Sequence, residues 1–87
     1  MALSNRTRLD FGLTLKPEFG SRKLATLGDA VRFIAELTPG KRETAHWKRA
    51  IFSLGSAVRE PRYITLATIN LQTALAMELM LHDPESA

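Results

Sequence analysis

The sequence predicts an α+β domain in which an N-terminal two-stranded β-hairpin packs on a three-helix unit, in the order ββααα. Three observations support this fold class. Apolar residues alternate with others from Leu9 to Leu15, which is the period of a half-buried strand. Residues 26–37 begin with a capping pattern and continue with helical apolar spacing. Residues 73–81 are rich in alanine, leucine and methionine, which favour helix.

Length and composition indicate one small domain. The chain has 87 residues, of which 45% are hydrophobic and 24% charged, as in an ordinary globular protein. We assign the domain to residues 9–82, with a flexible N-terminal tail at 1–8 and a C-terminal tail at 83–87. No cysteine is present, so neither a disulfide nor a thiolate metal site stabilises the fold.

Targeting segments are not evident in the sequence. Residues 1–11 lack the continuous apolar core of a secretory signal. The longest uncharged run, Tyr63 to Met77, is shorter than a membrane span requires and contains threonine, asparagine and glutamine. We therefore expect a cytoplasmic protein that does not enter the membrane.

The predicted hairpin has one buried face. A reversing loop at residues 16–21 contains Pro17 and Gly20, and residues 22–25 form the return strand. A hairpin alone is marginally stable in water, so we expect the first helix to cover its apolar side. The residues expected on that side of the first strand are Leu9, Phe11, Leu13 and Leu15.

The first helix is predicted over residues 26–37. Thr26 and Asp29 have the three-residue spacing at which a hydroxyl and a carboxylate each accept a bond from a backbone N–H at a helix start. Thr38-Pro39-Gly40 ends the helix, because proline disfavours helical geometry in the residue before it. The expected apolar stripe is Leu27, Ala30, Val31, Phe33, Ile34 and Leu37.

A second helix is predicted to follow and to continue to about Arg59. Gly55 within it costs about 1 kcal/mol relative to alanine. It either allows a close approach of another backbone or marks an early stop, and we favour continuation. The expected apolar stripe is Trp47, Ala50, Ile51, Leu54, Ala57 and Val58.

The third helix is predicted from Arg62 to Leu81, after Pro61 as an acceptable first residue. Residues 63–69 are rich in β-branched side chains and could instead form a strand. We favour one long helix that Asp83-Pro84 terminates.

This third helix is apolar around most of its circumference, and such a helix is normally buried on several sides. One hairpin and two helices offer too little surface to cover it. We therefore expect a second face of the helix to meet an identical copy across a two-fold axis. The alternative is a central helix that its own chain covers entirely. The residues expected to mediate self-association are Leu66, Ile69, Met77, Met80 and Leu81.

Basic residues form a candidate site for a polyanion. All twelve Lys and Arg residues lie at or before Arg62, and the charged residues that follow it are all acidic. Two basic pairs lie seven residues apart and return to nearly the same side of a helix beside Trp47, which could stack on a base. No helix-turn-helix or RNA-binding signature is present, and Trp47 also fits the core stripe. The candidate residues are Lys41, Arg42, Lys48, Arg49, Arg59 and Arg62.

No residue pattern indicates catalysis. His46 and His82 are far apart in sequence and have no cysteine to complete a metal site. Ser53 and Ser56 have no nucleophile elbow and no partnered histidine. The scattered glycines form no phosphate loop or dinucleotide fingerprint. We expect no enzymatic activity, no cofactor and no metal.

Several short motifs carry a resemblance. They are Phe-Gly-Leu-Thr-Leu at residues 11–15, Gly-Ser-Arg-Lys-Leu at residues 20–24, and Thr26 followed by Asp29-Ala30 and Phe33-Ile34. With the element order, they resemble a small family of alphaproteobacterial, rhizobial-type domains of unknown function, over most of residues 9–80. The resemblance implies the ββααα layout and a bacterial cytoplasmic setting, and it implies no functional residue.

Two functional hypotheses follow. The first is a non-enzymatic interaction module that forms a homodimer through its last helix and offers a surface to an unidentified protein partner. The second is a small nucleic-acid-binding protein that uses the basic residues. Steep salt dependence of binding to random DNA or RNA would distinguish the second from the first.

Overall fold

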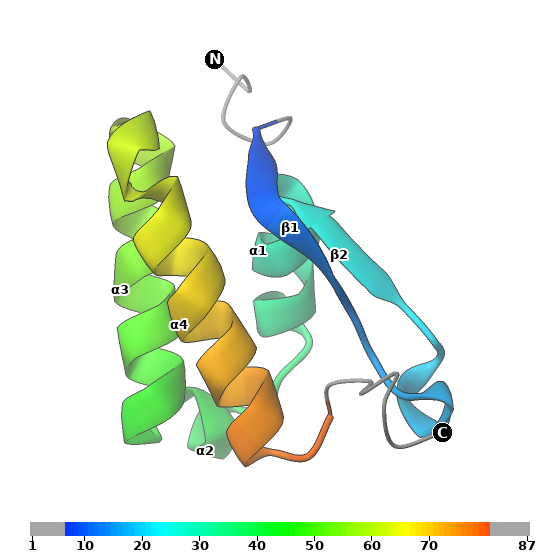
Figure 1. Cartoon of the computed structure of the whole chain (residues 1–87). Helices are drawn as coiled ribbons and strands as arrows, with labels where there is room; N and C mark the ends of the chain where they lie inside the picture. The colour runs from blue at the N-terminus through cyan, green and yellow to red at the C-terminus, as the bar shows by residue number, and fades with distance from the viewer. Residues whose placement is uncertain (1–6, 81–87) are drawn as a thin grey trace.

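The computed structural model describes residues 7–80 of the chain. An antiparallel two-stranded hairpin comes first and helices follow it (Figure 1), which confirms the predicted α+β class. The strands are β1 (Arg8–Thr14) and β2 (Lys23–Thr26), and the helices are α1 (Leu27–Ala35), α2 (Pro39–Arg42), α3 (Ala45–Arg59) and α4 (Ile64–Met77), with short 3-10 turns η2 (Pro17–Phe19) and η3 (Pro61–Tyr63).

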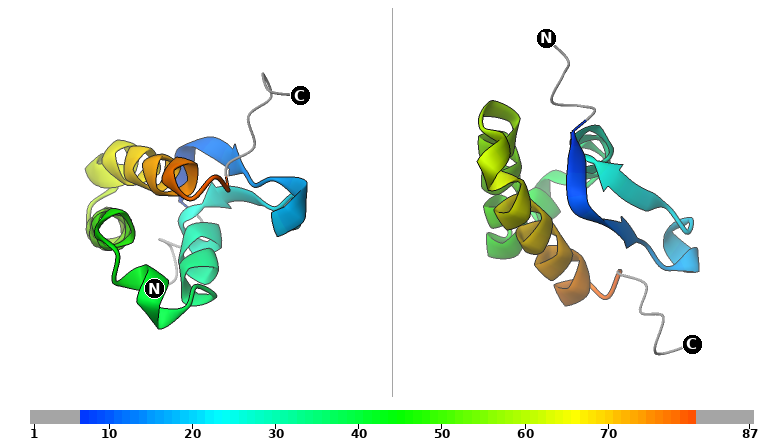
Figure 2. Two further views of the ribbon diagram at one scale, coloured as in Figure 1. Left: turned by 90° about the horizontal axis from the view of Figure 1, so that it is seen from below. Right: turned by 45° about the horizontal axis from the view of Figure 1, so that its top comes forward.

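The core lies between two layers. Helices α3 and α4 lie side by side, and the hairpin with α1 forms the other side of the molecule (Figure 2). Helix α4 contacts β1, and α1 contacts both β2 and α3, so the layers close around one set of apolar side chains. The largest fully buried apolar side chains are Trp47, Leu15, Leu24, Leu27, Leu71 and Leu75.

Strand β1 is irregular, which alters the predicted buried face. Arg8 pairs with Thr26 and Leu13 pairs with Leu24, so an advance of five residues along β1 corresponds to only two residues along β2. Extra residues of this kind form a bulge and redirect side chains. Leu9, Leu13 and Leu15 are buried as predicted, but Phe11 is 44% exposed, and its predicted place on the buried face is wrong.

The folded part begins slightly before the predicted domain boundary. Strand β1 starts at Arg8, and the Thr7 carbonyl accepts a 2.8 Å hydrogen bond from the Leu27 N–H. The last two residues of the predicted N-terminal tail therefore belong to the hairpin. The rest of that tail, the predicted C-terminal tail and Leu81 lie outside the described residues.

Helix α1 begins with the predicted capping box. Thr26 Oγ1 accepts a bond from the Asp29 N–H (3.2 Å), and Asp29 Oδ2 accepts bonds from the N–H groups of Thr26 (3.2 Å) and Ala25 (2.9 Å). These bonds, chiefly the one from Ala25, hold the pKa of the Asp29 carboxyl below its usual value. The helix ends at Ala35, two residues before the predicted end, and the next two N–H groups bond three residues back in a tightened last turn.

The predicted second helix is divided into α2 and α3. Thr38 Oγ1 accepts a bond from the Lys41 N–H (3.3 Å), and Pro39 occupies the first helical position, so a new single-turn helix begins there. Helix α3 starts afresh at Ala45 and continues through Gly55 to Arg59, as predicted. The prediction of one continuous helix bearing both basic pairs is therefore wrong.

The described part of the third predicted helix is helical, so the strand alternative for residues 62–71 is excluded. Turn η3 leads into α4, which ends at Met77. Leu79 has φ 59°, its N–H bonds to the Ala76 carbonyl (3.0 Å), and the Met80 N–H bonds to the Leu75 carbonyl (2.9 Å). These two bonds are the pair that defines a Schellman motif, which terminates a helix.

The Schellman motif also turns Met80 inward. The residue after the left-handed position commonly packs on the last turn of its own helix. Met80 is 9% exposed and belongs to the core, and its carbonyl accepts a 2.9 Å bond from the Lys16 N–H. The prediction that Met80 mediates self-association is therefore wrong.

We expect Leu79→Gly to raise the free energy of unfolding by about 0.5–1 kcal/mol. Left-handed geometry costs a residue with a side chain about 1–2 kcal/mol, and glycine avoids this cost. Part of the gain is lost because glycine gives the unfolded chain more conformational entropy. Denaturant unfolding followed by circular dichroism would measure the change. Leu79→Ala keeps the Cβ and should give no comparable gain, and equal effects of the two substitutions would contradict this account.

Candidate interaction surface

Helix α4 buries one side and exposes the other. Its buried residues are Ile64, Ala67, Thr68, Leu71, Ala74 and Leu75. At 100° per residue, the opposite side carries Leu66, Ile69 and Met77, which are 50%, 47% and 61% exposed. No charged residue occurs from Ile64 to Met77. Residues 7–80 therefore do not enclose α4, which favours the predicted exposed second face over the alternative of a helix covered entirely by its own chain.

Three of the predicted self-association residues lie together on this side of α4. They are Leu66, Ile69 and Met77, and with the exposed threonine at position 73 we call them the α4 face. They recur at three- and four-residue steps, so they form one stripe along the helix. Met80 lies in the core instead, and Leu81 lies outside the described residues.

Phe52 extends this apolar surface onto α3. Its side chain is 74% exposed, the highest value among the large hydrophobic residues described. Phe52 and Leu66 line the same pocket, so the two helices present adjacent apolar groups. Phe52 is absent from the predicted residues because it lies off the buried stripe of α3. A large aromatic residue on the polar side of an amphipathic helix is the signal that could have revealed it.

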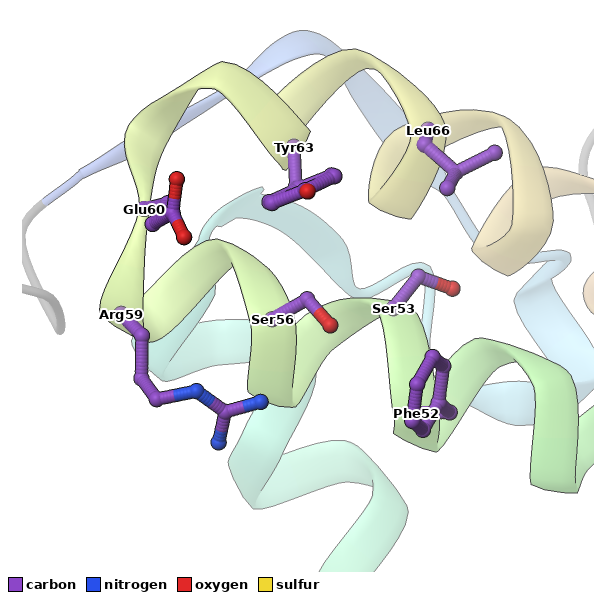
Figure 3. Close-up of a pocket in the computed structure, with 7 residues that line it drawn as sticks. All are labelled: Phe52, Ser53, Ser56, Arg59, Glu60, Tyr63 and Leu66. Carbon is purple, nitrogen blue, oxygen red and sulfur yellow. The ribbon is translucent and has the colours of Figure 1, made fainter.

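A pocket of about 240 Å³ lies between α3 and the start of α4, and Figure 3 shows the residues around it. The Ser53 hydroxyl donates to the Arg49 carbonyl (2.6 Å) and accepts from Asn70 Nδ2 (2.7 Å), which ties the two helices together beside the pocket. The lining combines apolar and polar groups from Phe52, Ser53, Ser56, Arg59, Glu60, Tyr63 and Leu66.

Charged groups lie at both ends of the uncharged α4 face. Just beyond its C-terminal end, the Glu78 carboxylate pairs with the Lys41 ammonium, and its second oxygen lies 2.8 Å from His46 Nε2. The hydrogen bond from Lys41, followed by that from His46, holds the pKa of the Glu78 carboxyl below its usual value. At the other end, Arg62 pairs with Glu60 at 2.9 Å. The charged groups beyond the two ends of α4 are thus already paired within the chain.

A second apolar area lies between α1 and α3. It is a groove of about 230 Å³, and a Cβ at Gly55 would meet nothing within 4 Å. Val31, Ile51 and Val58 line it and are 46%, 36% and 42% exposed. The apolar spacing of the sequence predicts these three residues in the core stripes of their helices. They border the core without being covered, which corrects that prediction.

The candidate polyanion residues are distributed over α2, α3 and η3. Lys41 pairs with Glu78, Lys48 lies 3.4 Å from Glu43, and Arg62 pairs with Glu60. The other three are Arg42, Arg49 and Arg59, which form no ion pair with the residues that the structure describes. Paired cations offer less charge to a phosphate backbone, and nucleic-acid binding stays a prediction.

Trp47 is a core residue rather than a stacking surface. It is 0% exposed, and its ring centroid lies 5.9 Å from that of Phe33. The proposal that it stacks on a base is therefore wrong, and its alternative assignment to the core stripe is confirmed. Its indole Nε1 has no hydrogen-bond partner among the described residues.

The described residues contain no cluster of metal-binding side chains, and His46 and Ser53 bond to other groups. Within residues 7–80, no three side chains of the metal-ligating types lie together. His46 is engaged with Glu78, and the Ser53 hydroxyl bonds to a carbonyl and an amide rather than to a histidine. In the same range, none of the helices has the length and apolar character needed to cross a bilayer.

Comparison of the chain with protein-family models, with curated proteins and with solved structures finds no match. The resemblance to the alphaproteobacterial family stays a prediction.

Proposed function

We propose that the protein is a non-enzymatic interaction module that forms a homodimer through the α4 face. The observation that supports this proposal is a 14-residue helix without charge whose outer side exposes Leu66, Ile69 and Met77. Contiguous exposed apolar surface of this kind is typical of an interaction site. Interfaces are enriched in aromatic residues and methionine and have few charged residues at their centres, and Phe52 and Met77 are exposed residues of these types.

A second copy is the partner whose surface fits this face. In a two-fold interface the same patch occurs on both partners, so an uncharged apolar stripe meets an identical stripe. The 14 residues of α4 form a stripe about 21 Å long. If the two α4 helices run antiparallel, the start of α4 in one copy lies near the end of α4 in the other.

The α1–α3 groove is the less suitable surface for self-association. Along α3 it extends only from Ile51 to Val58, so it is shorter than the α4 face. We therefore place the interface on α4.

Substitution of Ile69 tests the proposal. Ile69 lies near the middle of the α4 face, and no charged residue of α4 lies near it. We expect Ile69→Glu to raise the dimer dissociation constant at least about a hundredfold, because two unpaired carboxylates would be buried near the symmetry axis. Sedimentation equilibrium at micromolar concentration measures this constant, and circular dichroism checks that the helices are retained.

Val58→Glu is the matched control, since Val58 is exposed to a similar extent on α3 but lies in the α1–α3 groove. We expect this variant to dimerise like the wild type. A wild-type protein that sediments as a monomer contradicts the proposal. Dissociation by Val58→Glu but not by Ile69→Glu would place the interface in the groove instead.

A further inference from the structure

We infer that the pocket beside Leu66 receives the Met77 side chain of the second copy, so that each dimer contains two such insertions. This inference depends on the proposed dimer and specifies its register. Leu66 belongs both to the pocket and to the α4 face, so the pocket opens at the edge of the proposed interface.

Symmetry determines which residue meets the pocket. In an antiparallel pair of identical helices, the positions that face each other have a constant sum of residue numbers. Overlap is greatest when the two-fold axis passes near the middle of α4, which spans Ile64–Met77. Leu66 then faces the last turn of the partner helix, and Met77 is the exposed large apolar residue of that turn, at 61%.

The chemistry of the pocket suits a methionine. Phe52 and Tyr63 provide aromatic surface, and a thioether makes favourable contacts with aromatic rings. An unbranched side chain adapts to an irregular site more easily than a branched one. The pocket of about 240 Å³ corresponds to several water molecules at about 30 Å³ each, which leaves room for the four heavy atoms of a methionine side chain.

The Met77 side chain, which we call the knob, and the pocket lie at opposite ends of the same helix. Positions 66 and 77 are separated by about 16 Å along α4. A Met77 side chain therefore cannot reach the pocket of its own chain. Only a second copy, antiparallel to the first, can place Met77 there, and the same rotation fills both pockets.

Thiol cross-linking tests the register, because the chain has no cysteine of its own. Ser56 lines the pocket and is half-buried, so Ser56→Cys is a conservative change. We expect the double variant Ser56→Cys/Met77→Cys to form a covalent dimer with a short bismaleimide on a denaturing gel. Each single variant should stay monomeric on that gel, because its two identical thiols lie at opposite ends of the interface.

The outcomes separate this inference from the proposed dimer. Cross-linking of Met77→Cys alone would indicate a parallel or shifted arrangement and overturn the inference. The same conclusion follows if the double variant fails to cross-link while Ile69→Glu still dissociates the dimer. A monomeric wild type removes the proposed dimer and the inference together.

An energetic readout complements the cross-link. We expect Met77→Ala and Ser56→Phe each to raise the dimer dissociation constant about tenfold or more, because one removes the knob and the other fills the pocket. The Met77→Ala/Ser56→Phe double variant should have a dissociation constant no higher than that of the weaker-binding single variant, because both changes remove the same contact. Fully additive effects would overturn the inference, since they would place the two residues in independent contacts.

Discussion

Replacing Trp47 by alanine is expected to lower the free energy of unfolding by about 3–5 kcal/mol, which is the usual cost of truncating a buried aromatic residue. Trp47 is 0% exposed and packs on Phe33 at the junction of α1 and α3. A domain of 87 residues has a total stability of about 4–13 kcal/mol, so this loss removes a large part of it. Guanidinium unfolding followed by circular dichroism measures the change.

Trp47→Phe should be much less damaging than Trp47→Ala. The indole Nε1 is buried without a hydrogen-bond partner among the described residues, and an unsatisfied donor costs about 1–3 kcal/mol. Phenylalanine removes that donor while it retains an aromatic ring. Val58→Ala, an exposed position on the same helix, is the control and should change stability little. Equal losses for Trp47→Ala and Val58→Ala would show that Trp47 is not in the core.

Replacing Thr68 by valine is expected to lower the free energy of unfolding by about 1–3 kcal/mol without creating a cavity. Thr68 is fully buried, and its Oγ1 accepts a 3.1 Å bond from the Asp10 N–H in the β1 bulge. The same hydroxyl donates to the Ile64 carbonyl at 2.8 Å. Valine has nearly the same shape but leaves the Asp10 N–H without its acceptor.

Amide hydrogen exchange and denaturant unfolding provide the two measurements for Thr68→Val. We expect the Asp10 amide to exchange faster in the variant, because its hydrogen bond is lost. Thr65→Val is the matched control, since Thr65 is an exposed threonine on the same helix. If the two substitutions destabilise the protein equally, the bond between the bulge and α4 contributes nothing to stability.

The α4 face and the pocket explain different features of the same surface. In the proposed dimer, the exposed uncharged helix would drive association, and the pocket would select one orientation among those that an apolar stripe permits. Specificity of this kind requires a feature that only one arrangement satisfies. The knob and the pocket, at opposite ends of α4, provide such a feature.

Local sequence was sufficient to predict the hairpin, the capping box of α1 and most of α3 and α4. Each depends on residues close together in the chain, such as Thr26 with Asp29, whose hydrogen bonds form within one turn. The excess of apolar surface on the last helix was also evident, because composition alone shows that its circumference carries no charge.

Tertiary structure decided which apolar residues are covered. Phe11 faces outward because a bulge in β1 bonds to Thr68, a residue 58 positions away. Met80 turns into the core through the Schellman motif, and Phe52 stays exposed because nothing described packs over that side of α3. Periodicity reports the apolar positions of an element, but their burial depends on partners distant in the chain. Local spacing contains no information about those partners.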